Sequence, residues 1–161
     1  MKDTLIASLQ TAREHILGAL DGLDPSDLHR AVLPSGWTAL GLVNHLTVDV
    51  ERFWFSAVVR GDPATIASFE TESDAWQIPH DADGEAILTA YRTECERADA
   101  VLATADLDAA PAWWPQDLFG DFRLDTVGEV LLHVIVETTC HAGHLDAARE
   151  LIDGRQWIVL T

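Results

Sequence analysis

Histidine and glutamate recur at helical spacing in the segment between residues 133 and 146. The four residues concerned are His133, Glu137, His141 and His144. At about 100° per residue, intervals of three and four bring side chains back to the same face of an α-helix, so these four form one ladder. By the same count, the apolar stripe of this helix overlaps the ladder. His141 and His144 should therefore point toward the core, with Glu137 and His133 beside it.

That overlap predicts a bound cation, because burying a carboxylate and imidazoles among apolar side chains is costly unless something pairs with them. Imidazole and carboxylate together suit zinc, and also nickel, manganese or iron. Glu137 and His141, four residues apart on one face, can both reach one ion. The same Glu-x-x-x-His spacing also occurs on solvated helix faces, so a third ligand from another helix is needed to define a site.

A third candidate ligand is His45, in the segment at residues 35–46. Helical periodicity places His45 at the edge of the apolar stripe of its own helix, one turn before Asp49. Periodicity alone does not select it as a ligand, because a single histidine at such an edge is more often a boundary residue that hydrogen-bonds to a neighbour.

Four windows of helical periodicity would position these residues. They cover residues 3–21, the stretch from the turn at 34–36 to about residue 60, residues 85–104 and residues 126–152. Ser35 or Thr38 can cap the second helix. Thr126 and Glu129 match a capping box at the start of the fourth, and Gly154 is placed to end it.

Connections of roughly twenty residues separate the second, third and fourth helices, whereas a simple up-and-down bundle has tight turns. Such long connections can cross the end of a bundle and line a pocket there. We therefore predict an all-α fold, a single four-helix bundle domain over residues 1–161 with long crossover loops.

The charge of the chain narrows its possible partners. Ten Lys and Arg face 27 Asp and Glu, which gives a formal net charge of −17. Such a surface is unsuited to nucleic acid, whose binding depends on neutralising phosphates, and to anionic membranes. The apolar runs fall far short of the ~20 residues that span a bilayer, and the N-terminus lacks the features of a signal peptide. We expect a cytoplasmic protein with no nucleic-acid or membrane partner, in which Cys95 and Cys140 are free thiols.

Two segments resemble motifs of the DinB-like (DinB/YfiT-like) superfamily of metal-binding four-helix bundles. Residues 35–46 look like its second-helix motif, in which a Trp-Ser/Thr opening precedes a helix that carries a ligand histidine. Residues 137–146 are similar to its fourth-helix motif, where two ligands four apart precede a glycine and a polar residue. The likeness covers essentially the whole chain. It is closest to an actinobacterial branch related to the N-terminal domain of mycothiol-dependent maleylpyruvate isomerase.

The resemblance implies that His45, Glu137 and His141 hold one divalent metal ion, with zinc first and nickel or manganese as alternatives. Most of the superfamily uses three histidines, but the isomerase-like branch also has a glutamate at the position of Glu137. Four further residues are candidates to support the ligands or to line the pocket: His144, His133, Trp37 and Asp49.

The other histidines have competing interpretations. His144 is equally consistent with a core or interface residue, and His133 is an alternative ligand. His15, His29 and His80 have no partners at ligand spacing and are expected at the surface.

The function implied by the resemblance is a metal-dependent enzyme of the thiol-S-transferase type. It would use a low-molecular-weight thiol such as mycothiol on an electrophile, although the sequence singles out no catalytic residue. The chain ends at Thr161 without a counterpart of the isomerase's C-terminal domain, which makes isomerase activity the weaker expectation. Two alternatives stay open: a non-catalytic metal- or small-ligand-binding protein, linked for instance to stress, and a structural dimer without metal. The apolar tail at residues 157–160 leads us to expect a homodimer.

Overall fold

All secondary structure in the described part of the chain is helical. The computed structural model describes residues 1–71 and 74–157. Its elements, in chain order, are α1 (Lys2–Leu20), α2 (Pro25–Leu28), α3 (Ala39–His45), η1 (Leu46–Val59), α4 (Pro63–Ser68), α5 (Gly84–Thr104) and α6 (Val127–Asp153). The prediction of an all-α fold is confirmed.

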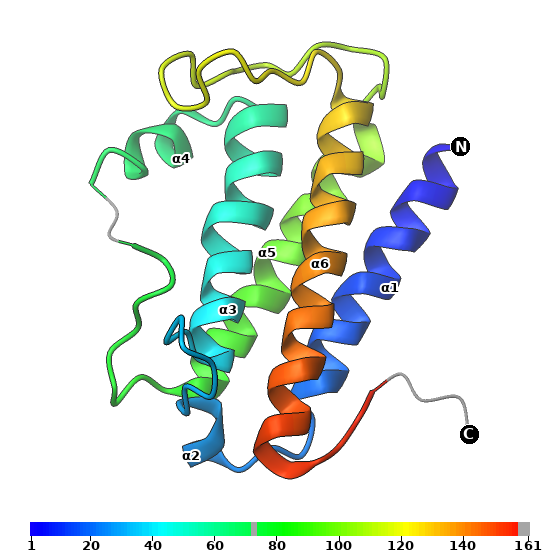
Figure 1. Ribbon diagram of the computed structural model, residues 1–161. Helices are drawn as coiled ribbons and strands as arrows, with labels where there is room; N and C mark the ends of the chain where they lie inside the picture. Colours follow the sequence, from blue (N-terminus) through cyan, green and yellow to red (C-terminus); the bar gives the residue numbers. More distant parts are fainter. Residues whose placement is uncertain (72–73, 158–161) are drawn as a thin grey trace.

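The long helices lie side by side (Figure 1), with α1 against α6 and η1 against both α5 and α6. Each contributes apolar residues at helical spacing to one shared core, including Ile16 from α1, Phe55 from η1, Tyr91 from α5 and Val134 from α6, all fully buried. Burial of these stripes is the main force that holds the helices together.

The second long helix changes its winding directly after His45. It begins as an α-helix, α3, and from Leu46 to Val59 it continues as a π-helix, η1. The sequence predicts one uninterrupted helix here and gives no sign of the change. Because π-winding is rare and recurs at functional sites, its start directly after His45 is notable.

Helix boundaries follow local capping chemistry. Thr38, rather than Ser35, caps α3 by accepting a hydrogen bond from the backbone N–H of Gly41. The capping box of Thr126 and Glu129 opens α6, and Gly154 ends it in the left-handed conformation at φ 79°. These boundaries confirm the sequence predictions, because each depends on a few neighbouring residues.

The two long connections carry structure that the sequence did not predict. Gly61 to Pro63 ends η1 as expected, but Asp62 then caps the short helix α4. The connection at residues 105–126 runs across the end of the long helices (Figure 1). It is held there by backbone hydrogen bonds from Trp113 to Val58 and from Val127 to Ala109.

The chain turns back on itself after α6. The ring of Trp157 stacks on His15 of α1 with centroids 6.0 Å apart, and it lies so close to Gly18 that an added Cβ there would be 2.0 Å from the ring. The rest of the apolar tail, from which we predicted a homodimer, lies outside the described residues.

None of the helices in the described ranges has the length and apolar character needed to cross a bilayer.

Candidate metal centre

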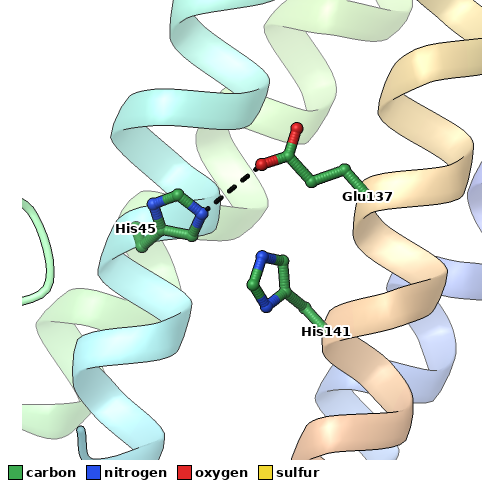
Figure 2. A group of neighbouring side chains, drawn as sticks. All are labelled: His45, Glu137 and His141. Carbon is green, nitrogen blue, oxygen red and sulfur yellow. Dashed lines mark ion pairs between the residues drawn. The ribbon is translucent and has the colours of Figure 1, made fainter. Parts of the chain in front are cut away.

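Three polar side chains from two facing helices meet beside the core (Figure 2). His45 is the last residue of α3, while Glu137 and His141 stand one turn apart on α6. One nitrogen or oxygen from each side chain lies within 4.8 Å of those of the other two. The structure thus brings together the set that the resemblance implied, and it does so from helices almost a hundred residues apart in the chain.

Two imidazole nitrogens in this cluster are buried without a hydrogen-bond partner. They are Nε2 of His45 and Nδ1 of His141. The nearest carboxylate oxygen, Oε1 of Glu137, is 3.6 Å from Nε2 of His45, which is too long for a hydrogen bond. A buried polar atom left unpaired costs about 1–3 kcal/mol, so such atoms in a folded protein call for a partner. A metal ion fits the three converging atoms, because one nitrogen from each histidine and one carboxylate oxygen are a ligand set typical of zinc and related divalent ions.

The electrostatics of the cluster keep two of its members in the form that binds a metal. Burial and the neighbouring His45 lower the pKa of His141 to about 4, so its ring is neutral at pH 7. Burial opposes ionisation of Glu137, but His133 and His45 outweigh it and lower the pKa of this carboxyl to about 2.

His45 is the exception. Burial alone would lower its pKa, but Asp49 and Glu137 outweigh that effect and raise the pKa to about 9. A metal ion therefore has to displace one proton from His45, as is usual when a histidine becomes a ligand.

Two neighbours fix the orientation of the cluster. Nδ1 of His45 donates to Oδ2 of Asp49 at 2.9 Å, one turn along the same helical rod. A hydrogen bond of this kind fixes the tautomer of a histidine and turns its other nitrogen toward the metal. Nε2 of His133 is 3.2 Å from Oε2 of Glu137, and so engages the oxygen that does not face His45.

An aromatic ring that the sequence did not single out covers His45. Trp76 stacks on its imidazole with ring centroids 4.3 Å apart and an interplanar angle of 18°. The loop that carries Trp76 is held against α3 by a hydrogen bond from Asn44 to the carbonyl of Ala75. Gly41 makes this approach possible, because a Cβ there would lie 2.5 Å from the carbonyl oxygen of Trp76. Asn44 and Gly41 lie inside the second-helix motif, so a signal existed, but it did not reveal the partner segment.

Two expectations about the surroundings are wrong. His144 is exposed rather than directed at the core, although its ring lies 5.6 Å from that of His141. A step of three residues along a helix rotates the side chain by about 300°. His144 is therefore turned about 60° from the direction of His141, which is enough to expose it to solvent. Trp37 does not line the cavity described below and lies instead beside Trp76, with ring centroids 6.4 Å apart.

The remaining histidines and the cysteines lie outside the cluster. His15 is not at the open surface as expected, because its side chain is 13% exposed and sits 2.6 Å from Asp146. His29 and His80 face each other with ring centroids 6.1 Å apart. Both cysteines are free. Burial raises the pKa of Cys95 well above its usual value, whereas Cys140 is exposed and lines the cavity.

A cavity of about 900 Å³ opens directly beside the cluster. His45, Glu137 and His141 form part of its wall, and His133 and Asp49 also line it. The rest of the wall is largely aromatic, with Phe53 and Trp54 from η1 and Phe119 and Phe122 from the connection before α6. A cavity of this size whose lining is mostly apolar by area is typical of a small-molecule site. The aromatic wall comes from two distant segments, so sequence analysis predicted a pocket at the loops without assigning these rings to it.

Comparison with known proteins agrees with this arrangement. A family model described as mycothiol-S-transferase matches residues 4–154. That family belongs to the DinB/YfiT-like metal-binding superfamily. The chain has no match among curated proteins and none among solved structures.

Proposed function

The chain belongs to the mycothiol-S-transferase family, and we propose that it is an enzyme that uses one divalent metal ion to transfer a low-molecular-weight thiol such as mycothiol to an electrophile. The observation that carries this proposal is the convergence of one nitrogen from His45, one nitrogen from His141 and one oxygen of Glu137 within 4.8 Å in the wall of a largely apolar cavity. The metal would be held by His45, Glu137 and His141, with zinc as the first choice and nickel or manganese as alternatives.

A divalent ion held there would act as a Lewis acid that lowers the pKa of a thiol, and would so generate the thiolate nucleophile at neutral pH. The chain's own residues prepare the site for it. Asp49 accepts a hydrogen bond from Nδ1 of His45, and Nε2 on the other side of the ring faces the cluster. His133 engages one oxygen of Glu137 and leaves the other directed at His45.

The cavity beside the cluster would hold the electrophile. Its aromatic wall would exclude water and position the electrophile next to the thiol, so that the reaction proceeds between two bound and oriented molecules. In the transfer, the thiol sulfur forms a bond to the electrophilic carbon while the leaving group departs with the electron pair of its own bond. The proton of the thiol passes to solvent.

Several properties of the molecule belong to the same proposal. The long helices α1, α3 with η1, α5 and α6 would form one DinB-type four-helix bundle domain, closed at one end by the crossover connection before α6. We place the protein in the cytoplasm, where a reduced thiol is available. We also propose a homodimer, supported by the exposed apolar side chains Leu132, Val136 and Leu151 on α6.

Turnover tests the proposal. Tag-free protein reconstituted with zinc is mixed with mycothiol and 1-chloro-2,4-dinitrobenzene, and formation of the thioether is followed by its absorbance. We expect conjugation above the uncatalysed rate, its loss on chelation, and no activity in His141→Ala. The variants His29→Ala and His80→Ala serve as controls and should keep full activity. Full metal occupancy with no turnover, using several thiols and electrophiles, would instead support a metal-binding protein without catalysis.

A further inference from the structure

The cavity beside the cluster is shaped for a flat apolar molecule. The rings of Trp54 and Phe119 are nearly parallel, at 9° with centroids 5.6 Å apart, and Phe53 meets Trp54 edge-on at 5.1 Å. Offset and edge-to-face ring contacts are the arrangements that aromatic groups prefer, so an aromatic guest can extend this stack. Phe122 and Leu118 continue the apolar wall toward solvent and are 44% and 61% exposed.

Carboxylates outnumber the other charged side chains in the wall of the cavity. Asp49, Asp74 and Glu137 line it, whereas no lysine or arginine does so among residues 1–71 and 74–157. The six residues outside those ranges include no lysine or arginine in the sequence. Arg52 and Arg123 stack over the rings of Phe69 and Trp114, and neither lines the cavity.

The histidines in the wall do not reverse this balance. His45 and His133 each face a carboxylate, at 2.9 Å from Asp49 and 3.2 Å from Glu137. His141 is one of the three groups that would hold the ion. Glu137 and a thiolate together match the charge of a divalent ion, so the ion leaves no excess positive charge for a second anion. An anionic guest would lose its hydration and meet carboxylates without compensation.

We infer that the cavity selects an uncharged aromatic electrophile and disfavours analogues that carry a carboxylate. That the preferred molecules are substrates rests on the proposed function, whereas the binding preference is a property of the cavity itself. With 1-chloro-2,4-dinitrobenzene as the example, a new carbon–sulfur bond replaces the carbon–chlorine bond, chloride leaves, and the thiol proton goes to solvent.

Equilibrium binding of two unreactive compounds tests the inference without turnover. The probes are 1,3-dinitrobenzene and 3,5-dinitrobenzoate, which share one ring and differ by a single carboxylate. Binding is followed by quenching of tryptophan fluorescence, in metal-free protein and in zinc-loaded protein saturated with mycothiol. We expect the neutral probe to bind at least ~10-fold more tightly, a difference of about 1.4 kcal/mol. Equal affinities, or tighter binding of the benzoate, would overturn the inference.

A matched pair of variants localises the effect. Leu118→Arg places a cation at the cavity wall on a side chain that is 61% exposed. It should strengthen binding of 3,5-dinitrobenzoate relative to that of 1,3-dinitrobenzene several-fold. Leu151→Arg is the control, because Leu151 is 59% exposed and does not line the cavity. If both variants strengthen benzoate binding equally, the preference reflects the net charge of the protein and the inference fails.

The outcome for this inference can be separated from that for the proposed function. Preferential binding of dinitrobenzene, together with no thiol conjugation by the zinc-loaded protein, would contradict the proposed function and leave the cavity's preference standing. Efficient conjugation of a carboxylated electrophile would uphold the function and overturn the selectivity.

Discussion

Of the polar clusters that lie between helices in the described ranges, two contrast clearly: one is closed by its own hydrogen bonds and the other is open. In the first, Arg13 of α1 donates two hydrogen bonds to Glu51 of η1, at 2.7 and 2.6 Å, and a third to Asp99 of α5 at 2.7 Å. Arg13 and Glu51 are 3% and 1% exposed. In the second, His45 and His141 each keep a buried nitrogen without a hydrogen-bond partner.

The difference shows what marks a binding site in this fold. Both clusters combine nitrogen groups with a carboxylate at the core, and both come from helices that pack together. The Arg13 cluster joins helices, because the geometry of the guanidinium group matches that of the Glu51 carboxylate. The His45 cluster leaves donor atoms open beside a cavity. Single unsatisfied buried oxygens also occur at Tyr91 and Thr138. What distinguishes the metal site is therefore the convergence of three potential ligand atoms beside a cavity, and not burial or charge alone.

The largest expected change in stability comes from breaking the closed cluster. Arg13→Met should lower the free energy of unfolding by about 3–5 kcal/mol, because it leaves the Glu51 carboxylate buried without its partner. Urea denaturation measures this change. Arg92→Met is the control, since its pair with Glu85 is exposed, and it should cost less than about 1 kcal/mol.

A second substitution checks the reason for that loss. Arg13→Met combined with Glu51→Leu should recover much of the stability, because apolar replacement removes the unpaired charge. A small effect of Arg13→Met alone would show that the closed cluster contributes little and that the contrast between the two clusters is wrong.

The open cluster should respond to its ligand in the opposite way. Adding zinc to the metal-free protein, to about 100 times the dissociation constant, should raise the free energy of unfolding by about 2.7 kcal/mol. The reason is mass action, because the folded chain holds the three donors together and the unfolded chain does not. His141→Ala should lose this gain. Stabilisation of His141→Ala by zinc equal to that of the wild type would place the binding elsewhere.

A smaller effect should follow from the side chain that orients His45. Asp49→Ala should weaken zinc binding by about 10–100-fold, because the Nδ1 hydrogen bond no longer turns the imidazole toward the cluster. Competition with a zinc indicator measures the change. Asp74→Asn is the matched control, since it also removes a cavity carboxylate while keeping the oxygen that accepts the backbone N–H of Trp76. Equal weakening by both variants would point to general electrostatics rather than to the hydrogen bond.

The smallest effect concerns the scaffold alone. Thr126→Ala removes the side chain that caps α6 and should lower the free energy of unfolding by about 1 kcal/mol. The affinity of the folded protein for zinc should not change, because the capping box lies more than two turns before Glu137. A parallel loss of affinity would mean that the start of α6 positions the cluster.

Sequence analysis predicted the long helices well because their signals are local. The capping box at Thr126, the cap at Thr38 and the left-handed end at Gly154 each depend on a few adjacent residues. The π-winding of η1 was not predicted, because no local signal marks it. The short helix α4 does carry a local signal, the Asp62 cap followed by Pro63, which the prediction took only as the end of the preceding helix. Glu137 and His141 could be grouped by helical periodicity alone.

The rest of the site depended on contacts between distant segments. Periodicity placed His45 at the edge of its stripe, and only the family resemblance identified it as a partner of α6. Trp76 and Phe119 belong to connections whose paths follow from tertiary contacts, so their places over His45 and in the cavity wall could not be predicted. The prediction that His144 points toward the core was wrong. Counting about 100° per residue gives the direction of a side chain but does not locate the boundary between the buried and the exposed face of the helix.

The central claim is that His45, Glu137 and His141 together hold one metal ion, and anomalous diffraction at the zinc edge tests it most directly. Crystals of tag-free, zinc-loaded protein should show one strong peak per chain, at about 2.0–2.2 Å from one atom of each of the three side chains. A principal peak at any other group of residues, or one bound by His133 or His144 in place of His45, would contradict the account.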